Sequence, residues 1–514
     1  MHPSLSKVLR APQQFVDSVG MYRTVTLALS ILVACSVSFG FLGIIAYSGG
    51  DQIIALTVAL GTALLLNWIT ATSSKIPANH ESAAITALIL FFLVVPGKSV
   101  IQNWPLVAAV AIAIMSKFTI VYRKQHLLNP AAVGAAALSV PGFFVFSWWI
   151  GTPAMFVPLL IVGSLVVMKV RKWTPVLWFV GLGASMYLFE ATLFDGASFA
   201  TINTGIQSYF LSGPALFLAF FMLTEPFTMP PTKKSQAVYG ALVGLLANIP
   251  LAISHFAMTP DLALVIGNIL VAPLRLHQKL YLYLEEKRLV AKDTYEFIFK
   301  KPRGFTFSPG QYLEWMLPHK PYDGHGIRRY FTIASSPTES VVRVAMKIVP
   351  HGSSYKTALQ ALDTNEMVIA SQLAGDFVLP KNVSKKLGFI AGGIGVTPFR
   401  SQIKYMIDSG KAADTALYYC VNTRDEIAYL DIFNQAASKF VFNFVPVVSK
   451  EEVKLPFESG YVTAEMISRR TADFLERSWY ISGPPGMVNT YSKLLREMGV
   501  ASKQIKTDFF PGVA

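Results

Sequence analysis

The chain has very little cysteine and little charge. It holds two cysteines, Cys35 and Cys420, among 514 residues, so neither a disulfide framework nor a cysteine-ligated iron–sulfur cluster can form from its own residues. Charged residues make up 14% of the sequence and hydrophobic residues 53%, which is too apolar for an ordinary soluble protein. The composition therefore predicts a membrane protein.

The N-terminus also lacks the features of a removable signal peptide. Its sequence, MHPSLSKVLRAPQQF, has no small-residue cleavage site after a short apolar region, so we expect residues 1–23 to remain as a cytoplasmic extension. The net charge of +14 comes from short basic clusters between apolar runs. Because these clusters form no dense basic stripe, they argue against nucleic-acid binding and are interpreted as topology signals.

Apolar runs dominate the sequence up to about residue 275. A membrane helix needs about 20 apolar residues, and ten segments reach or approach this length. Their approximate spans are 24–47, 53–71, 82–95, 104–120, 131–150, 153–168, 175–194, 209–227, 236–255 and 261–275. The third and the last are short, and Pro96-Gly97 and Pro141-Gly142 interrupt the series in the manner of broken helices that line a site.

Basic residues lie almost entirely at one set of span ends. With the N-terminus inside, the outer loops contain Lys98 alone. The inner ends and loops carry Lys7, Arg10, Arg23, Lys75, Arg123, Lys124, Lys169, Arg171, Lys172, Lys233, Lys234 and Arg275. One span more or fewer would invert every later loop, so this asymmetry predicts a membrane domain over 24–275 with about ten spans and both termini cytoplasmic. We expect it in the cell's inner (plasma) membrane.

After residue 280 short strands and amphipathic segments replace the apolar runs. Residues 281–385 are rich in strands and in turns such as Ser308-Pro309-Gly310, whereas residues 386–514 alternate strand and helix patterns, which implies a parallel sheet. The fold class is thus a polytopic α-helical membrane domain followed by a soluble module of two parts.

Two glycine turns follow strands in the last part. Residues 388–399, GFIAGGIGVTPF, indicate a buried strand that empties into a glycine turn and then a helix, whose free N–H groups can face a pyrophosphate. A lone glycine loop fits a simple tight turn equally well. Residues 478–488, SWYISGPPGMV, form a second strand-end turn placed to close a nicotinamide pocket from the side.

A row of polar and aromatic residues lies on a strand upstream. Residues 327–336, IRRYFTIASS, suit a flavin, with Arg329 on its phosphate, Tyr330 or Phe331 against its ring and Thr332 bonded to its polar edge. An edge strand with solvated arginines fits the same row.

The order of these pieces resembles the ferredoxin-NADP reductase family. The family's Arg-x-aromatic-Ser/Thr pattern appears as residues 329–332, and its second flavin-phosphate loop as residues 352–354. The resemblance implies an antiparallel β-barrel that binds FAD over 281–385 and an α/β domain that binds NAD(P) over 386–514. The FAD-binding residues it implies are Arg329, Tyr330, Phe331, Thr332, Lys347, Gly352, Ser353, Ser354, Phe509 and Phe510.

The family's nicotinamide signature, Gly-Gly-x-Gly-x-x-Pro, appears as residues 392–398. The implied NAD(P)-binding residues are Gly392, Gly393, Gly395, Thr397, Pro398, Thr423, Arg424, Gly483, Pro484 and Met487. Ser482 stands where many members have a cysteine beside the nicotinamide, and Phe509 or Phe510 is expected over the flavin's open face. The implied reaction is hydride transfer from NADH or NADPH to FAD without a catalytic acid or base. Arg424 suits a 2′-phosphate or adenine stacking, so the nucleotide stays open.

Three polar segments, 79–86, 126–134 and 224–232, lie at inner ends of membrane spans. Helix capping explains much of their polarity, although Glu81 and Glu225 are costly near hydrocarbon and are therefore functional candidates. In this order the segments resemble the RnfD/NqrB membrane subunits of Rnf and sodium-translocating NADH:quinone reductase complexes.

Members of that family carry FMN bound through a phosphoester to a threonine on the outer side. The attachment pattern, Asp-x-x-Ser/Thr-Gly-Ala-Thr/Ser, appears as Asp195 to Thr201 with Ser198 in place, but Phe199 replaces its glycine. The resemblance implies covalent FMN on Thr201, a possible second membrane flavin and partners such as RnfG/NqrC-like subunits. A plain Ser/Thr-rich outer loop is the alternative.

Together the two resemblances predict an NAD(P)H-dependent flavin oxidoreductase. Electrons would pass from FAD through membrane flavin to quinone or an extracytoplasmic acceptor, with Na⁺ or H⁺ transport as an open question. One alternative is a ferric-reductase type of enzyme, which needs paired intramembrane histidines, whereas His80, His126 and His255 lie unpaired at span ends. A nucleotide-regulated transporter is the other.

Overall fold

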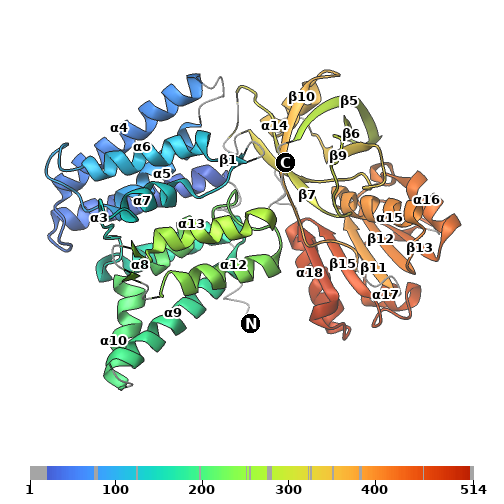
Figure 1. The fold of residues 1–514 in the computed structure, drawn as a ribbon. Coiled ribbons are helices and arrows are strands. Elements are labelled where there is room, and N and C mark those ends of the chain that lie inside the picture. The colour runs from blue at the N-terminus through green and yellow to red at the C-terminus, as the bar shows by residue number, and fades with distance from the viewer. Residues whose placement is uncertain are drawn as a thin grey trace. The chain divides into compact units, whose positions relative to one another are not determined.

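The computed structural model describes residues 20–73, 79–122, 125–195, 198–249, 252–253, 256–274, 280–321, 323, 327–349, 352–380, 385–454 and 457–509. Phe510 lies outside this set, and only the backbone is described for Asp195, Thr201 and Phe509. The chain forms two compact units, Met1–Gln278 and Lys279–Ala514, and Figure 1 shows that the first is helical and the second contains both sheets.

The first unit contains helical structure within every predicted span. Its helices are α3 (Met21–Phe41), α4 (Gly49–Ser73), α5 (His80–Leu93), α6 (Trp104–Thr119), α7 (Pro130–Ser139), α8 (Pro153–Val170), α9 (Trp173–Asp195), α10 (Phe199–Gln207), α11 (Ala215–Phe217), α12 (Lys233–Leu246) and α13 (Pro260–Val271). Two hairpins of two-residue strands join them: β1 (Val121–Tyr122) with β2 (Gln125–His126), and β3 (Ala252–Ile253) with β4 (Phe256–Ala257).

Length and composition qualify only some of these helices as complete membrane spans. In the described part of the chain three pass, α3, α4 and α8, and a bent pair over residues 202–212 and 215–222 makes up to four. The other apolar helices are shorter over their fully described residues, and α9 counts there only as Trp173–Phe189. The first unit is therefore a bundle of apolar helices, and the number of about ten spans stays a prediction.

Two segments differ from the predicted spans. The span over 131–150 was expected to be continuous, but α7 ends at Ser139, and Gly142 adopts a positive φ of 78°, a conformation that ends a helix. Residues 199–207, expected in an outer loop, form α10 instead. Helix α10 runs directly into a π-helical turn, η1 (Ser208–Ser212), and a second π turn, η2 (Leu218–Met222), follows α11.

The second unit begins with a six-stranded antiparallel sheet. Its strands are β5 (Leu280–Ala291), β6 (Thr294–Lys300), β7 (Tyr312–Met316), β8 (Arg328–Thr332), β9 (Val341–Lys347) and β10 (Met367–Ala374), in the order β8-β7-β10-β5-β6-β9. The Ala334 N–H donates to the Arg343 carbonyl at 2.8 Å, so the chain beyond β8 meets the opposite edge strand and the sheet curls toward a barrel. Buried residues such as Leu282, Phe297 and Trp315 fill its core, and α14 (Ser354–Ala361) follows β9.

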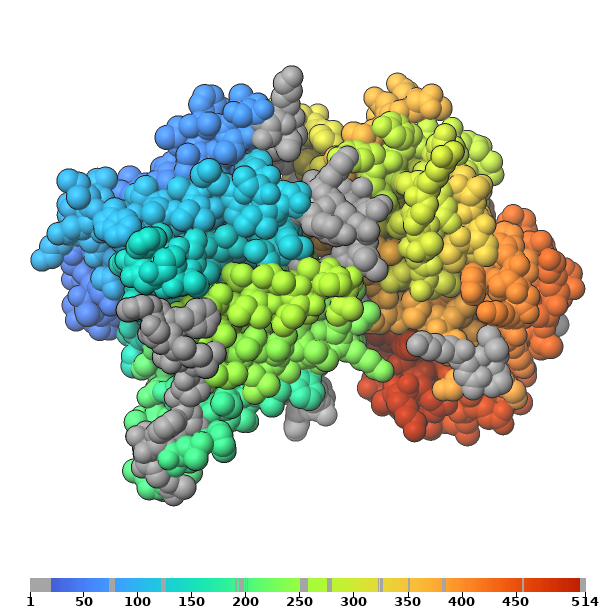
Figure 2. Space-filling view, viewed as in Figure 1, coloured from blue at the N-terminus to red at the C-terminus, as the bar shows by residue number. Residues whose placement is uncertain are grey.

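A parallel six-stranded sheet completes the unit, in the order β14-β13-β12-β11-β15-β16. Its strands are β11 (Leu387–Gly392), β12 (Thr415–Val421), β13 (Phe442–Val448), β14 (Glu458–Ser459), β15 (Ser478–Gly483) and β16 (Ile505–Phe509). The helices are α15 (Thr397–Ser409), α16 (Leu430–Lys439), α17 (Ala464–Arg470) and α18 (Pro485–Glu497). In Figure 2 the yellow antiparallel part and the orange parallel part of this unit pack as one body.

The strand order fixes where this sheet binds ligands. From β11 the chain proceeds outward on one side through β12, β13 and β14, and then returns to place β15 and β16 on the other side of β11. In doubly wound sheets the crevice at the carboxyl ends of the two strands flanking this reversal is the ligand site. Here those strands are β11 and β15, and the two predicted glycine turns follow them.

Candidate flavin and nicotinamide sites

The two glycine turns of the parallel sheet lie in direct contact. A Cβ added at Gly395 would stand 2.5 Å from the Ser482 carbonyl oxygen, and one at Gly392 would stand 2.4 Å from the Met487 sulfur. Gly393 has φ +52°, a left-handed conformation that glycine adopts without strain. The structure thus brings the residues predicted from both turns to one edge of the sheet, and close packing there requires glycine.

Helix α15 begins at this edge. Thr397 and Pro398 form its first turn, and the Thr397 hydroxyl donates to the Ile394 carbonyl at 3.2 Å. Proline suits the first helical position because no N–H is needed there. The remaining N–H groups and the helix dipole favour an anionic ligand such as a pyrophosphate.

Ser482 lies at the end of β15, beside the glycine turn. It is fully buried, and among the described residues its Oγ has no hydrogen-bond partner. A buried hydroxyl without a partner costs about 1–3 kcal/mol. A ligand with a polar edge would remove this cost, which fits the predicted position beside a nicotinamide carboxamide.

Strand β8 carries the predicted flavin row, and its two rings lie on opposite faces. The Phe331 ring packs 5.8 Å from the Tyr355 ring, whereas Tyr330 is 42% exposed and donates from its hydroxyl to Glu314 Oε1 at 3.2 Å. Thr332 is buried, and its Oγ1 lacks a partner among the described residues. Strand β8 is an edge strand, as the alternative has it, but its arginines pair with Glu314 and Asp323. The Thr332 hydroxyl stands where a bond to a flavin edge was predicted.

Arg329 forms one side of an anion-binding cluster at the start of α14. Its Nη2 lies 2.9 and 3.1 Å from the two carboxylate oxygens of Asp323. Asp323 Oδ2 also accepts from the Ser353 hydroxyl and from the Ser354 backbone N–H, both at 3.1 Å. The residues predicted to bind the FAD phosphate thus converge on the Asp323 carboxylate.

Lys347 and the predicted ribose residues lie in a second polar cluster. Lys347 Nζ pairs with Glu426 Oε1 at 2.8 Å, so it is engaged with the turn after β12. In that turn Thr423 donates to Asp425, and Arg424 Nε lies 3.2 Å from Glu451 Oε2. Hydrogen bonds and the charge of Lys347 outweigh burial and hold the Glu426 pKa below its ordinary value.

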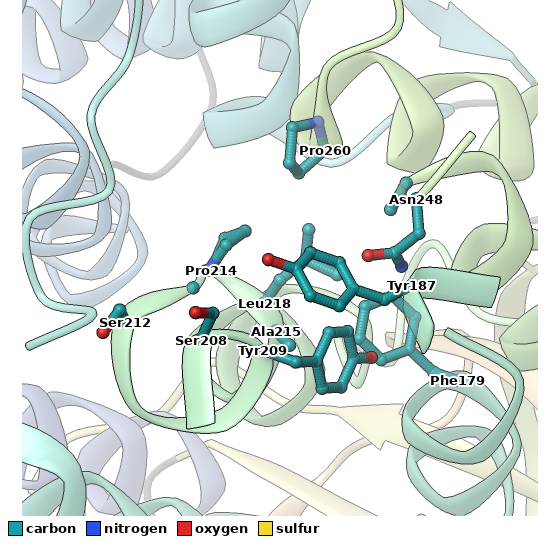
Figure 3. A pocket seen from close by; sticks show the side chains of 12 residues that line it. Phe179, Tyr187, Ser208, Tyr209, Ser212, Pro214, Ala215, Leu218, Asn248 and Pro260 are labelled. Atoms are coloured by element: carbon teal, nitrogen blue, oxygen red, sulfur yellow. The ribbon is translucent and has the colours of Figure 1, made fainter. Parts of the chain in front are cut away.

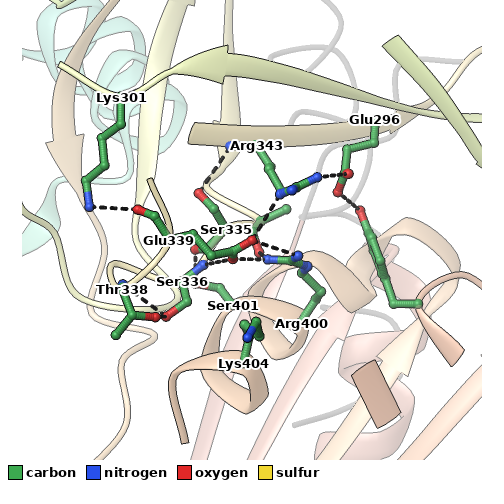
Figure 4. A network of polar contacts seen from close by, with 12 residues as sticks. Glu296, Lys301, Ser335, Ser336, Thr338, Glu339, Arg343, Arg400, Ser401 and Lys404 are labelled. Atoms are coloured by element: carbon green, nitrogen blue, oxygen red, sulfur yellow. Dashed lines mark hydrogen bonds and ion pairs between the residues drawn. The ribbon is translucent and has the colours of Figure 1, made fainter. Parts of the chain in front are cut away.

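A buried polar network joins the flavin row to α15 (Figure 4). Arg400 on α15 donates from Nη2 to Glu339 Oε1 at 3.0 Å and from Nη1 to the Ala334 carbonyl at 3.1 Å. The Ser401 hydroxyl donates to the Ser335 carbonyl at 2.6 Å. Ala334 and Ser335 follow β8 directly, so these bonds tie the end of the flavin row to the helix that follows the glycine turn.

The network continues along the antiparallel sheet. Arg343 bonds Glu339 Oε1 at 3.0 Å and Glu296 Oε2 at 2.7 Å, and the Tyr429 hydroxyl donates to Glu296 Oε1 at 3.0 Å. Burial raises the Glu339 pKa, but hydrogen bonding and charge from Arg400 outweigh it and hold that pKa below its ordinary value. The sequence did not predict this cluster or Asp323, because Ser353 and Arg400, which complete the two clusters, lie 30 and 61 residues from Asp323 and Glu339.

In the membrane unit two of the three polar segments meet. His126 Nε2 lies 3.2 Å from Glu225 Oε1, and the Thr228 hydroxyl donates to Glu225 Oε2 at 3.1 Å. Asn79 and Asn129 cap α5 and α7 by accepting from backbone N–H groups, as the capping alternative predicts. Glu225 goes beyond capping, because it joins the second and third segments.

Further polar contacts link helices whose sequences showed no motif. Lys117 Nζ on α6 bonds the carbonyl and the hydroxyl of Ser82 at 2.9 and 3.0 Å. Asn268 on α13 accepts from the Asn129 N–H at 2.8 Å and donates to the Tyr239 hydroxyl at 2.7 Å. Ser82 and Asn129 belong to the predicted polar segments 79–86 and 126–134, whereas Lys117, Tyr239 and Asn268 are isolated polar side chains in apolar helices that no spacing signal marked.

The proposed FMN motif spans the junction of α9 and α10. Asp195 is the last residue of α9, Ser198 is exposed between the helices, and Thr201 lies in the first turn of α10. The structure describes no side chain for Asp195 or Thr201, so the attachment stays a prediction.

Comparison with known protein families finds one match in each half of the chain. Residues 143–277 match the NQR2, RnfD, RnfE family, and residues 389–493 match the Oxidoreductase NAD-binding domain. The chain thus contains a segment similar to the first family and a segment similar to the second, and both predicted resemblances are confirmed.

Relatives of the C-terminal half include reductase components of oxygenases. The reductase component of propane 2-monooxygenase from Rhodococcus jostii is 27% identical over 221 residues, which cover 42% of this chain and 58% of that protein. The flavohemoprotein of Candida albicans is 26% identical over 39% of this chain and 50% of its own length. The chain therefore spans about half the length of these relatives. The prediction of an NAD(P)H-dependent flavin oxidoreductase is confirmed for this unit.

Solved structures similar to this unit include the Amycolatopsis cytochrome P450 reductase GcoB, with 22% identity, a TM-score of 0.42 and coverage of 46% of this chain and 72% of that one. Another is a ferredoxin NADP⁺ reductase from Neisseria gonorrhoeae with bound FAD and NADP, with 19% identity, a TM-score of 0.39 and coverage of 45% and 98%.

Proposed function

We propose that this protein oxidises NADH or NADPH in its C-terminal unit and passes the electrons through FAD into its membrane unit. The observation that carries this proposal is the meeting of the two glycine turns at the reversal of the parallel sheet, tied by Arg400 and Ser401 to the flavin row of β8. Residues 143–277 of the same chain match the NQR2, RnfD, RnfE family, which supports a second electron-carrying unit.

The chain's own residues bind and align the reactants. Arg329, Ser353 and the first N–H of α14 would hold the FAD diphosphate, and Thr332 would bond the polar edge of the flavin. The glycine turn and the start of α15 would hold the nicotinamide diphosphate, with Ser482 beside the carboxamide. When bound, FAD supplies the hydride acceptor and the means to release single electrons. The chemistry then needs alignment and no protein acid or base.

The membrane unit would take the electrons to quinone or to an extracytoplasmic acceptor, with FMN on Thr201 as the outer carrier. The charge asymmetry that supports cytoplasmic termini also supports an outer position for residues 195–201. The hydrocarbon core is about 30 Å thick, so a second membrane flavin or a partner subunit such as an RnfG/NqrC-like protein would bridge the distance. Coupled Na⁺ or H⁺ movement belongs to the same proposal.

Flavin analysis tests the covalent site. The full chain, produced in cells that flavinylate membrane subunits, is denatured and examined for in-gel fluorescence beside Thr201→Ala and Thr204→Ala variants. Thr204 lies on the same helix but outside the motif. We expect fluorescence in the native sequence and in Thr204→Ala, and its loss in Thr201→Ala alone. Equal fluorescence in all three proteins would show that FMN is not attached to Thr201.

NAD(P)H oxidation tests the cytoplasmic site. Purified full-length protein in detergent is assayed with ferricyanide as the electron acceptor, and its released flavin is identified. FAD, and oxidation that falls at least tenfold in Gly395→Ala, would support the proposal. A Soret band in the spectrum would instead favour the ferric-reductase alternative, although the described His126 pairs with a carboxylate and not with a second histidine.

A further inference from the structure

Two features of the structure have no role in the function proposed above. One is a cavity of about 260 Å³ at a break in the helices of the first unit, where the rings of Tyr187 and Tyr209 lie 5.7 Å apart (Figure 3). The other is Tyr429, a buried residue of the second unit with a strained backbone. Of the two, Tyr429 lies next to residues predicted to bind the nucleotide, because it ends the turn after β12 that carries Thr423 and Arg424.

The backbone of Tyr429 is left-handed, with φ 64° and ψ 28°, at the N-terminus of α16. This conformation is rare for a bulky side chain, whereas glycine adopts it readily. Strained conformations persist where the surrounding contacts hold them in place, and they cluster at functional sites. The side chain of Tyr429 must therefore make contacts that outweigh the strain.

The Tyr429 side chain joins the two sheets of the second unit. Its hydroxyl donates to Glu296 Oε1 on β6 at 3.0 Å, and Glu296 Oε2 accepts from Arg343 Nη1 at 2.7 Å. The Arg400 guanidinium lies over the Tyr429 ring, 5.6 Å from its centroid, in a cation–π contact. Arg343 and Arg400 both bond Glu339. These five residues therefore form a closed cycle of contacts, of which Figure 4 shows the part from Glu296 to Arg400.

The bond between Tyr429 and Glu296 is shielded from water. Tyr429 is 7% exposed and Glu296 is 2% exposed. Burial and the charge of Glu296 raise the pKa of Tyr429 well above its ordinary value, so the hydroxyl keeps its proton and donates it to the carboxylate. Hydrogen bonds to a buried charged group are among the strongest in proteins. The bond is therefore a firm link between the two sheets.

Other contacts between the turn after β12 and the antiparallel sheet are more exposed. Lys292, between β5 and β6, bonds Asp425 through its backbone N–H at 2.9 Å and through its side chain at 3.1 Å. Lys347 pairs with Glu426 at 2.8 Å. The two lysine side chains are 52% and 36% exposed, and exposed ion pairs contribute little to stability. We therefore expect the buried bond of Tyr429 to hold the turn most firmly.

We propose that Tyr429 and Glu296 are positioning residues that hold the nicotinamide nucleotide in register with the flavin. Their bond fixes the turn predicted to bind the ribose, and the same cycle of contacts holds the start of α15 through Arg400. Hydride transfer needs its two reacting carbon and nitrogen atoms about 3–3.5 Å apart, and a misplacement of about 1 Å can slow a reaction about 100-fold. The proposal rests on the function proposed above and adds residues that lie outside both predicted binding sites.

Full-length protein in detergent provides the test. Tyr429→Phe removes the hydroxyl and keeps the ring beneath Arg400. Tyr418→Phe is the matched control, because it removes another buried tyrosine hydroxyl, which bonds Thr471 Oγ1 at 2.7 Å within the parallel-sheet part. Glu296→Gln weakens the same bond from the acceptor side and guards against a folding defect in Tyr429→Phe.

Two readouts separate positioning from stability. The first is steady-state oxidation of the preferred nucleotide, unlabelled and deuterated at C4, with ferricyanide as the acceptor. The second is hydrogen–deuterium exchange of residues 422–428 without nucleotide, which reports local opening of the turn.

In Tyr429→Phe and Glu296→Gln we expect kcat to fall about tenfold while KM changes less than twofold. The deuterium isotope effect on kcat should rise, because hydride transfer then takes a larger share of each turnover. Exchange of residues 422–428 should become at least tenfold faster. Tyr418→Phe should match wild-type protein in all three measurements. The double variant should be no slower than Glu296→Gln alone, because the two residues act through one bond.

A normal kcat and isotope effect in Tyr429→Phe, even with a lower melting temperature, would show that the bond only stabilises the fold and would overturn the proposal. An additive fall in the double variant would overturn it as well. Failure of wild-type protein to oxidise either nucleotide would overturn the proposed function, and with it the role of this bond, whereas normal variants beside an active wild type overturn the role alone.

Discussion

Arg329 and Asp323 are paired at 2.9 Å on the donors that a flavin diphosphate needs. The same carboxylate accepts from Ser353 and from the N–H of Ser354, and two anions cannot share these donors without strong repulsion. On the proposed assignment of this site, FAD would therefore compete with Asp323 for Arg329. Asp323→Asn should tighten FAD binding about tenfold, because one charge-assisted bond contributes about 1.5–3 kcal/mol.

Fluorescence titration of deflavinated full-length protein measures this effect. Arg329→Ala should weaken FAD binding at least tenfold in the same assay, and Asp363→Asn, an exposed carboxylate in the same unit, should leave it unchanged. Weaker binding in Asp323→Asn would mean that the carboxylate orients Arg329 for FAD and does not compete with it.

Contact between the two glycine turns predicts that alanine is tolerated at Gly486 but not at Gly395. A Cβ at Gly395 would meet the Ser482 carbonyl at 2.5 Å and the Gly483 Cα at 2.8 Å, whereas one at Gly486 meets nothing within 4 Å. Gly395→Ala should therefore raise the KM for the nicotinamide at least tenfold, and Gly486→Ala should change it less than twofold. The flavin content of both variants serves as the folding control, and a normal KM in Gly395→Ala would contradict the assignment of this turn.

The turn after β12 predicts a preference for NADH. Two cations there are each matched by a carboxylate: Arg424 by Glu451 at 3.2 Å and Lys347 by Glu426 at 2.8 Å. A 2′-phosphate needs a cation without such a partner. Wild-type protein should use NADH better than NADPH, and Glu451→Gln should release Arg424 and raise kcat/KM for NADPH about tenfold, equivalent to about 1.4 kcal/mol.

Initial rates with NADH and with NADPH give the ratio of the two kcat/KM values directly. Glu452→Gln removes the charge of the adjacent, exposed residue and should leave the ratio unchanged. A wild-type preference for NADPH would show that Arg424 reaches the phosphate despite Glu451.

Local sequence patterns predicted the elements of the second unit well. A buried strand, a glycine turn and a proline at the start of a helix are adjacent in the chain, and they appear as β11, residues 393–396 and α15. The same holds for β15 and α18. Such motifs are readable because each depends on backbone conformations within about ten residues.

Contacts between residues far apart in the chain could not be predicted from such local patterns. Glu339 and Arg400 are separated by 61 residues, and His126 and Glu225 by 99. No short sequence motif contains both members of either pair, so the sequence did not indicate these contacts. In the first unit apolar composition marked the helices but not their ends, since α7 ends at Ser139, three residues before the left-handed Gly142. The cavity between helices depends on packing and carried no sequence signal.

The Glu339–Arg400 pair predicts how acid affects the second unit. The folded-state pKa of Glu339 is depressed, so its contribution to stability is fully present above the unfolded pKa, which is about 4.3, and is lost as pH falls through the folded value. Glu339→Gln leaves Arg400 buried without its charge partner, and breaking a buried pair costs about 3–5 kcal/mol. The variant should therefore release FAD at a temperature at least about 6 °C lower at pH 7, and this difference should shrink below about pH 4.

Flavin fluorescence during heating of the full chain measures the temperature of FAD release, with Glu465→Gln, an exposed carboxylate on α17, as the charge-matched control. An equal shift at pH 7 and at pH 3.5 would show that Glu339 acts through packing and not through its charge.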